Sequence, residues 1–119
     1  MSKRILIVCR QPPYGSSLAR EAVDLALASS VFEQQLAVLF LADGVLQLLK
    51  DQHSQAIDMK NHGNVLGAFP LYELNDIYID LQALSDRSIT QADLLLEGKH
   101  LSTAQITDLI AEYDIVLNF

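Results

Sequence analysis

Three charged residues, Arg10, Asp43 and Asp80, lie at or just after the ends of segments that the sequence predicts to be strands. The carboxyl ends of parallel strands meet at one edge of an open α/β sheet, and ligands and catalytic groups gather there. Together with Tyr14, from the turn after Arg10, these residues could form a charged pocket with two acids and one base. The alternative is that the acids cap helices or turn the chain, since Asp43 precedes Gly44 and Asp-Gly is a turn signal in any protein.

Cys9 is the single cysteine of the 119-residue chain and ends an apolar run. Burial would raise the pKa of its thiol and make it unreactive. The alternative is a sulfur atom open to the same sheet edge beside Arg10, whose charge would favour a thiolate. Cys9 could then act as a redox or persulfide thiol in a stand-alone homo-oligomer. A single cysteine excludes an internal disulfide and a cysteine-based metal cluster within one chain.

Other catalytic patterns are missing from the sequence. Gly15 has no glycine-rich phosphate-loop companions, and no G-x-S-x-G elbow is present. His53, His62 and His100 lack the spacing of metal ligands and lie among polar residues, which is typical of surface positions. The sequence therefore predicts no catalytic residue, no metal and no cofactor.

The expected elements favour an α/β fold. Apolar runs over 3–9 and 36–42 are typical of strands buried on both faces of a parallel sheet. Further strands are expected over 76–80, 92–96 and 115–119, and helices from Ser16 or Ser17 to 29, over 45–49 and 81–87, and after 102. Ser102 and Gln105 have the spacing of a capping box. We expect one domain, residues 1–119, built as a three-layer α/β/α sandwich with about five mostly parallel strands.

The segment 63–74 is apolar but contains two glycines and a proline, so it is not expected to be a regular core element. It follows a polar stretch over 51–60 and could begin with a short helix over 63–67. Exposed apolar segments often mark contact surfaces, which makes this segment a candidate subunit interface. The contributing residues would be Val65, Leu66, Phe69, Leu71 and Tyr72. The alternative is a packed loop that covers one edge of the sheet.

Composition narrows the class of protein. Apolar residues form 50% of the chain, charged residues 19%, and the net charge is -7. No apolar run approaches the roughly 18 to 20 residues that cross a bilayer, and the first run ends too early for a signal peptide. We therefore expect a cytoplasmic protein without membrane contact. Its acidic surface would be repelled by a phosphate backbone, so direct nucleic-acid binding is not expected.

Four segments resemble the TusC/DsrF branch of the DsrE/DsrF/DsrH family, over essentially the full chain. They are QPPYG at 11–15, REAVD at 20–24, FLADGVLQLL at 40–49 and YDIVL at 113–117. The most specific part is ADGV at 42–45. The resemblance implies a DsrE/DsrF-like fold and membership in a heterohexamer, made of two heterotrimers, with TusB/DsrH-like and TusD/DsrE-like subunits.

The resemblance also implies a role in sulfur transfer. In the Tus system such a complex passes persulfide sulfur toward 2-thiolation of the wobble uridine of certain tRNAs, and in the Dsr system it serves sulfur oxidation. The sulfur-bearing cysteine of the TusD/DsrE-type subunit follows the third strand, and Asp80 lies at about that position here. A carboxylate cannot hold sulfane sulfur, so the resemblance implies a non-catalytic scaffold subunit. The likeness to TusC favours tRNA thiolation.

Overall fold

The computed structural model describes residues 3–13, 17–30, 35–49, 66–67, 69–72, 74 and 76–119. Within these ranges, five strands form one parallel sheet in the order β4-β3-β2-β1-β5, which confirms the expected α/β class. The strands are β1 (Arg4–Cys9), β2 (Gln35–Phe40), β3 (Ile77–Asp80), β4 (Lys99–Leu101) and β5 (Ile115–Asn118). The last four residues of β1 are buried, as expected for an apolar strand that is covered on both faces.

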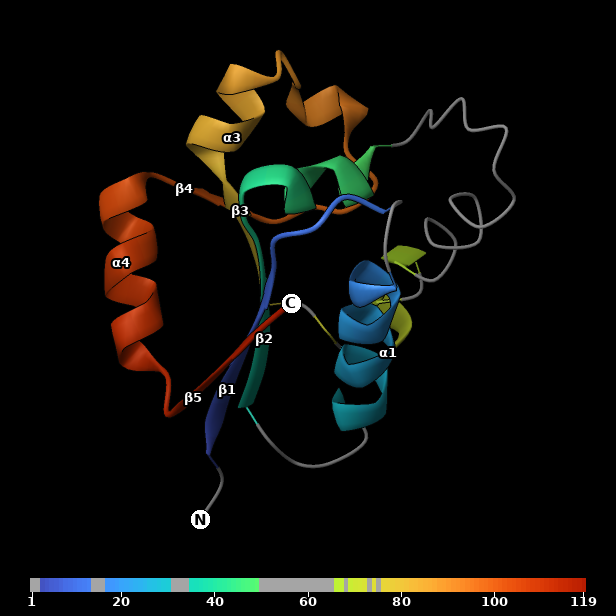
Figure 1. Ribbon diagram of the computed structural model, residues 1–119, viewed down its shortest axis with the longest axis vertical. Helices are drawn as coiled ribbons and strands as arrows, with labels where there is room; N and C mark the ends of the chain where they lie inside the picture. The colour runs from blue at the N-terminus through green and yellow to red at the C-terminus, as the bar shows by residue number, and fades with distance from the viewer. Residues whose placement is uncertain are drawn as a thin grey trace.

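Two helices cover opposite faces of the sheet (Figure 1). α1 (Leu18–Ser30) packs on β1 and β2, and α4 (Thr103–Glu112) lies on the other side. The chain moves outward from β1 to β4, and α4 then carries it back past β1 to β5. Right-handed crossovers in the two directions place their helices on opposite faces, so the strand order accounts for the three layers.

Each face of the sheet has its own apolar cluster. The cluster on the α1 side includes Phe40, Val23 and Phe69, and the cluster on the α4 side includes Leu39 and Leu109. Residues 39 and 40 are neighbours in β2 and point to opposite faces, which is the alternation that a strand imposes. The sheet is therefore buried by helices on both sides at its centre.

The helix α4 begins where the sequence predicts it. The hydroxyl of Ser102 accepts a hydrogen bond from the Gln105 N–H at 3.3 Å. The Gln105 side-chain oxygen accepts one from the Ser102 N–H at 2.8 Å. This capping box satisfies two N–H groups that otherwise lack partners at the start of the helix.

The expected strand over 92–96 is wrong. The structure has a 3₁₀-helix, η3 (Gln91–Asp93), followed by a single bridge between Leu94 and Leu49. Thr90 and Asp93 form a reciprocal capping box, which begins a helical turn where an extended strand was expected. The fourth strand is β4, which pairs with β3 from Tyr78–Lys99 onward.

Smaller differences concern element ends. β2 ends at Phe40 instead of 42, and the expected helix over 45–49 is the 3₁₀-helix η1 (Ala42–Leu48), which begins three residues earlier. α3 (Leu81–Asp86) agrees with the expectation. Of the expected helix over 63–67, only residues 66–67 are described, and the polar stretch 51–60 lies outside the described residues. No helix in the described ranges is long and apolar enough to cross a membrane.

Candidate functional site

The carboxyl ends of the strands meet η1 and α3 at the top of the view in Figure 1. We call residues 9–11, 41–44 and 80–83 the carboxyl rim. Asp80 is its most constrained side chain. The residue is 8% exposed and is the N-cap of α3. One carboxylate oxygen accepts a hydrogen bond from the Ala83 N–H, and the other accepts one from the Ala42 N–H, both at 3.2 Å.

The second of these bonds ties two distant parts of the chain together. Ala42 begins η1 with a φ of 51°, in the left-handed region that disfavours residues with a side chain. The Asp80 carboxylate holds the N–H of this strained residue in place. Asp80 is therefore a helix cap, which was the alternative interpretation of the acids, and it is also a clamp between α3 and η1, which the sequence did not predict.

Gly44 explains why η1 can come so close to β1. A Cβ atom on this glycine would lie 1.8 Å from the carbonyl oxygen of Cys9, which no side chain can tolerate. The same carbonyl accepts a hydrogen bond from the Leu41 N–H at 2.9 Å. Besides turning the chain, the Asp-Gly pair at 43–44 therefore allows η1 to contact the backbone of β1 closely at the rim.

Asp43 lies on the exposed side of the rim. It accepts a hydrogen bond from the Arg87 guanidinium at 2.6 Å, and the same guanidinium donates to the Ala83 carbonyl at 3.1 Å. Both side chains of this ion pair are partly exposed, at 28% for Arg87 and 56% for Asp43, so solvent weakens it. Arg87 was not among the expected rim residues, because only the folded chain brings it 2.6 Å from a residue 44 positions away.

Arg10 is the base that the sequence placed beside the two acids. Its side chain is exposed, and its backbone N–H donates to the Phe119 carbonyl at 2.9 Å. In the described part of the chain we find no ion pair between its guanidinium and Asp43 or Asp80. Tyr14 lies outside the described residues. The rim acids therefore bond to Arg87 and to backbone N–H groups.

Cys9 is the first residue of the rim, but its side chain lies in the core. It is 1% exposed, and burial raises the pKa of its thiol to about 12. A thiol with such a pKa is almost entirely protonated at neutral pH, and the thiolate is the reactive form. The structure thus favours the unreactive reading of Cys9 over the exposed, Arg10-activated one.

Gln47 is a buried polar residue that the sequence analysis did not single out. It is fully buried, and its amide nitrogen donates to the carbonyl of Gln11 at 2.8 Å. This bond anchors the segment after β1 to η1. A glutamine in an otherwise apolar helical stretch (VLQLL) was the only available signal, because the acceptor lies 36 positions away.

Of the candidate interface residues, two are buried in this chain, and the side chains of the other three are not described. Leu66 and Phe69 are fully buried in the core of this chain, so their side chains are not available to a partner in this conformation. For these two residues the placement supports the packed alternative. Val65 lies outside the described residues, and Leu71 and Tyr72 belong to η2 (Phe69–Tyr72), whose side chains at these two positions are not described. An interface through the rest of the segment stays a prediction.

These contacts limit the chemistry of the rim. The two Asp80 oxygens are bound to N–H groups, Asp43 is ion-paired, and the Cys9 thiol is buried and protonated. Within the described ranges, no group of three or more His, Cys, Asp or Glu side chains could hold a metal ion. The described rim is thus built as a structural junction and presents no activated nucleophile.

Comparison with known proteins gives the same fold and a family. A structure titled "Crystal structure of ychN protein from E. coli" superimposes with a TM-score of 0.81 over 98% of this chain and 99% of that one, at 20% identity. A "Protein TusC homolog" of Pseudomonas aeruginosa is 35% identical over 117 residues, 98% of each chain. Proteins of the same name from Vibrio parahaemolyticus and Vibrio vulnificus are each 34% identical, over 92% of this chain and 93% of theirs. The DsrE/DsrF-like family model matches residues 3–119. The chain therefore belongs to the DsrE/DsrF-like family.

Proposed function

We propose that this chain is a cytoplasmic, non-catalytic subunit of a sulfur-relay complex that supports 2-thiolation of the tRNA wobble uridine. The relatives named TusC homolog support the assignment to such a complex. The observation that carries the non-catalytic part is the role of Asp80, whose two oxygens hold backbone N–H groups of α3 and η1.

The chemistry of sulfur transfer explains why this observation matters. Sulfane sulfur moves when a thiolate attacks a sulfur–sulfur bond, so a carrier needs an accessible cysteine with a lowered pKa. Asp80 provides no sulfur at the end of β3, and Cys9 is buried with its pKa raised to about 12. A subunit of the TusD/DsrE type would then supply the sulfur-bearing cysteine. A net charge of -7 leaves tRNA contact to other components.

Native mass spectrometry tests the assembly directly. We would co-express this chain with the neighbouring genes of its operon and record which subunits remain together, and in what ratio. One copy of this chain for each copy of two related subunits is the expected result. A homo-oligomer without partners would contradict the proposal.

A second measurement separates the two pathways. We expect deletion of the gene to lower 2-thiouridine in total tRNA hydrolysates, and restoration of the gene on a plasmid to recover it. An unchanged 2-thiouridine level, with a defect in sulfur oxidation, would instead assign the chain to a DsrF-like role.

A further inference from the structure

The strand β5 forms an apolar edge of the sheet. It lies at one end of the strand order and, among the described strands, pairs with β1 alone. Ile115, Val116 and Leu117 are each only partly buried, whereas β1 and β2 bury nearly all of their apolar side chains. An edge strand that carries no lysine, proline or bulge is open to pairing with another chain.

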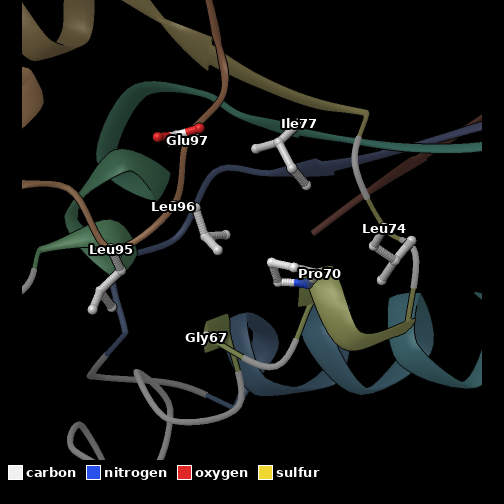
Figure 2. Close-up of a pocket in the computed structure, with 7 residues that line it drawn as sticks. All are labelled: Gly67, Pro70, Leu74, Ile77, Leu95, Leu96 and Glu97. Carbon is white, nitrogen blue, oxygen red and sulfur yellow. The ribbon is translucent and has the colours of Figure 1, made fainter.

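The opposite edge of the sheet, β4, has features that discourage such pairing. It is three residues long, and Lys99 on it is exposed. Glu97, just before it, lines an apolar pocket of about 480 Å³ together with Ile77 and Leu96 (Figure 2). Short length and charged side chains are common protections of an edge strand. The two edges therefore differ, and β5 is the unprotected one.

The side of β5 that faces the α1 layer is only partly covered. α1 packs mainly on β1 and β2, and α4 lies on the other side of the sheet (Figure 1). Side chains alternate along a strand, so Ile115, Leu117 and Phe119 share the α1 side. Phe119 packs against the apolar cluster on that side, but Ile115 and Leu117 belong to neither cluster of the described residues. Two apolar side chains of β5 are therefore left at the surface.

Backbone hydrogen bonds show which groups of β5 point outward. The Phe119 N–H donates to the Val8 carbonyl, and the Phe119 carbonyl accepts from the Arg10 N–H, both at 2.9 Å. In a parallel ladder the two groups of one residue point to the same neighbouring strand, and the next residue points to the opposite side. Ile115 and Leu117 therefore face β1, as Phe119 does. The N–H and carbonyl groups of Val116 and Asn118 point away from the sheet.

We propose that β5 pairs with β5 of a second copy of this chain, antiparallel, about a two-fold axis at Leu117. Val116 of each copy is then opposite Asn118 of the other, so the outward N–H and carbonyl groups of both strands find partners. An axis at Val116 would instead require the backbone N–H of Asp114, which already donates to the Arg4 carbonyl at 2.9 Å. The existing hydrogen bonds thus select the register.

The side chains in this register fit a second copy. On the α1 side, Leu117 meets its own counterpart and Ile115 lies opposite Phe119 of the second copy, so apolar side chains face each other. β5 carries no charged side chain, so two chains of net charge -7 place no like charges within the ladder. Exposed Arg10, bonded through its N–H to Phe119, comes to the same end of the ladder as Asp114 of the second copy, which has the opposite charge.

This inference goes beyond the proposed function and needs only this chain. Within the proposed complex, which contains two copies of the chain, the contact would join the two heterotrimers. In the isolated protein it would produce a dimer with a continuous sheet.

Disulfide cross-linking of the full chain tests the register. Two residues that face each other in a non-hydrogen-bonded antiparallel pair have Cα atoms about 4.5 Å apart, within the roughly 4.4 to 6.8 Å that a disulfide spans. Leu117→Cys should therefore form a covalent dimer under mild oxidation, seen on a gel without reductant. Asn118→Cys is the matched control, because it is more exposed but lies beyond about 7 Å from its counterpart. Wild type controls for Cys9, which is buried.

We expect Leu117→Cys to cross-link at least about tenfold faster than Asn118→Cys, and wild type not to cross-link. Equal rates for the two cysteine variants would overturn the proposal, because they would indicate random collision.

Sedimentation velocity over a wide range of protein concentration tests the pairing without a cross-link. Wild type should dimerise as concentration rises, and Leu117→Lys should raise the dimer dissociation constant by about tenfold or more, because it places two like charges opposite each other. Ala104→Lys makes the same change in charge at an exposed position of α4 and should stay within about twofold of wild type. Circular dichroism checks that both variants are folded.

A wild-type chain that stays monomeric throughout, or a Leu117→Lys variant that dimerises as wild type does, would overturn the pairing. Neither result bears on the sulfur-relay proposal, which the co-expression experiment tests separately.

Discussion

The two ends of the sheet are stabilised by different kinds of contact. At the carboxyl rim, the buried Asp80 carboxylate binds two backbone N–H groups, and Gly44 lies against the Cys9 carbonyl. At the amino end, Arg4, Glu112 and Tyr113 form a partly exposed group that we call the amino cluster. The Arg4 guanidinium lies 4.7 Å from the centre of the Tyr113 ring, donates to the Glu112 carbonyl at 3.0 Å and approaches the Glu112 carboxylate at 3.8 Å.

The difference shows where the fold depends on single atoms. A buried N–H group that loses its acceptor has no water molecule to take the acceptor's place. A tight backbone contact has no space for an added atom. Exposed charges exchange protein contacts for solvent at little cost. The rim should therefore be the more sensitive end of the sheet in this chain.

The largest expected effect is at Gly44. We expect Gly44→Ala to lower the free energy of unfolding by about 3 kcal/mol or more, because its methyl group would overlap the Cys9 carbonyl oxygen. Urea unfolding followed by circular dichroism measures this change. Gly67→Ala is the control, since an added Cβ there meets nothing within 4 Å, and it should change stability by no more than about 0.5 kcal/mol. Similar losses in both variants would refute the steric explanation.

Asp80 comes next in magnitude. Asp80→Ala removes a helix cap and the acceptor for the Ala42 N–H, and we expect a loss of about 2 kcal/mol. Asp80→Asn should lose roughly half as much, because an amide oxygen can still cap α3 while the amide NH₂ cannot accept from Ala42. The same urea experiment compares the three proteins. A fully stable alanine variant would show that the carboxylate is not a structural clamp.

The strands and helices show how much of the fold can be predicted from the sequence. Runs such as ILIVC and AVLF, and the Ser102–Gln105 spacing, are local signals, and they located β1, β2 and α4 to within a few residues. β4 has the sequence KHL, which has no apolar pattern, and it is a strand only because β3 lies beside it. Local signals cannot predict an element that depends on its neighbour.

The candidate site was predicted only in part, because its contacts also depend on residues that are distant in the sequence. The sequence located Asp43 and Asp80 at the rim, and it gave capping as one of two readings. It could not show that Arg87, 44 positions from Asp43, would be the ion-pair partner in place of Arg10. It also could not show that Asp80 would bind the N–H of Ala42, 38 positions away. Such pairings follow from tertiary packing.

Cys9 allows a pH-dependent test of the rim. Its thiol has a pKa near 9.0 in an unfolded chain and about 12 when folded, so above pH 9 the unfolded state loses a proton that the folded state retains. Stability therefore falls as pH rises through this window, by about 1 kcal/mol at pH 10 relative to pH 8. Cys9→Ala should lack this part of the decline. If wild type and variant have parallel pH profiles, the thiol is not buried as described.

The amino cluster should respond more weakly. We expect Arg4→Ala to cost between about 0.5 and 1 kcal/mol, because its ion pair with Glu112 is exposed. Burial and the nearby Tyr78 hydroxyl raise the pKa of Tyr113 to about 12, while Arg4 opposes that shift. Ultraviolet titration of the phenolate should therefore show a further rise in the Arg4→Ala variant. A loss as large as that of Asp80→Ala would remove the contrast between the two ends.

The smallest expected effect is a gain in stability at Ala42. Its φ of 51° is strained for alanine and free for glycine, so Ala42→Gly should stabilise the fold by about 0.5 kcal/mol. Ser88, with a φ of 54° after α3, has the same strain and is the control, because no described contact joins it to Asp80. If the Asp80 carboxylate holds Ala42 in this conformation, the gain at Ala42 should shrink in the Asp80→Ala background, where the backbone can relax. The gain from Ser88→Gly should be unchanged, since separate sites add. If the Ala42→Gly gain is equal in the wild-type and Asp80→Ala backgrounds, the Ala42 backbone is fixed without the help of the Asp80 carboxylate.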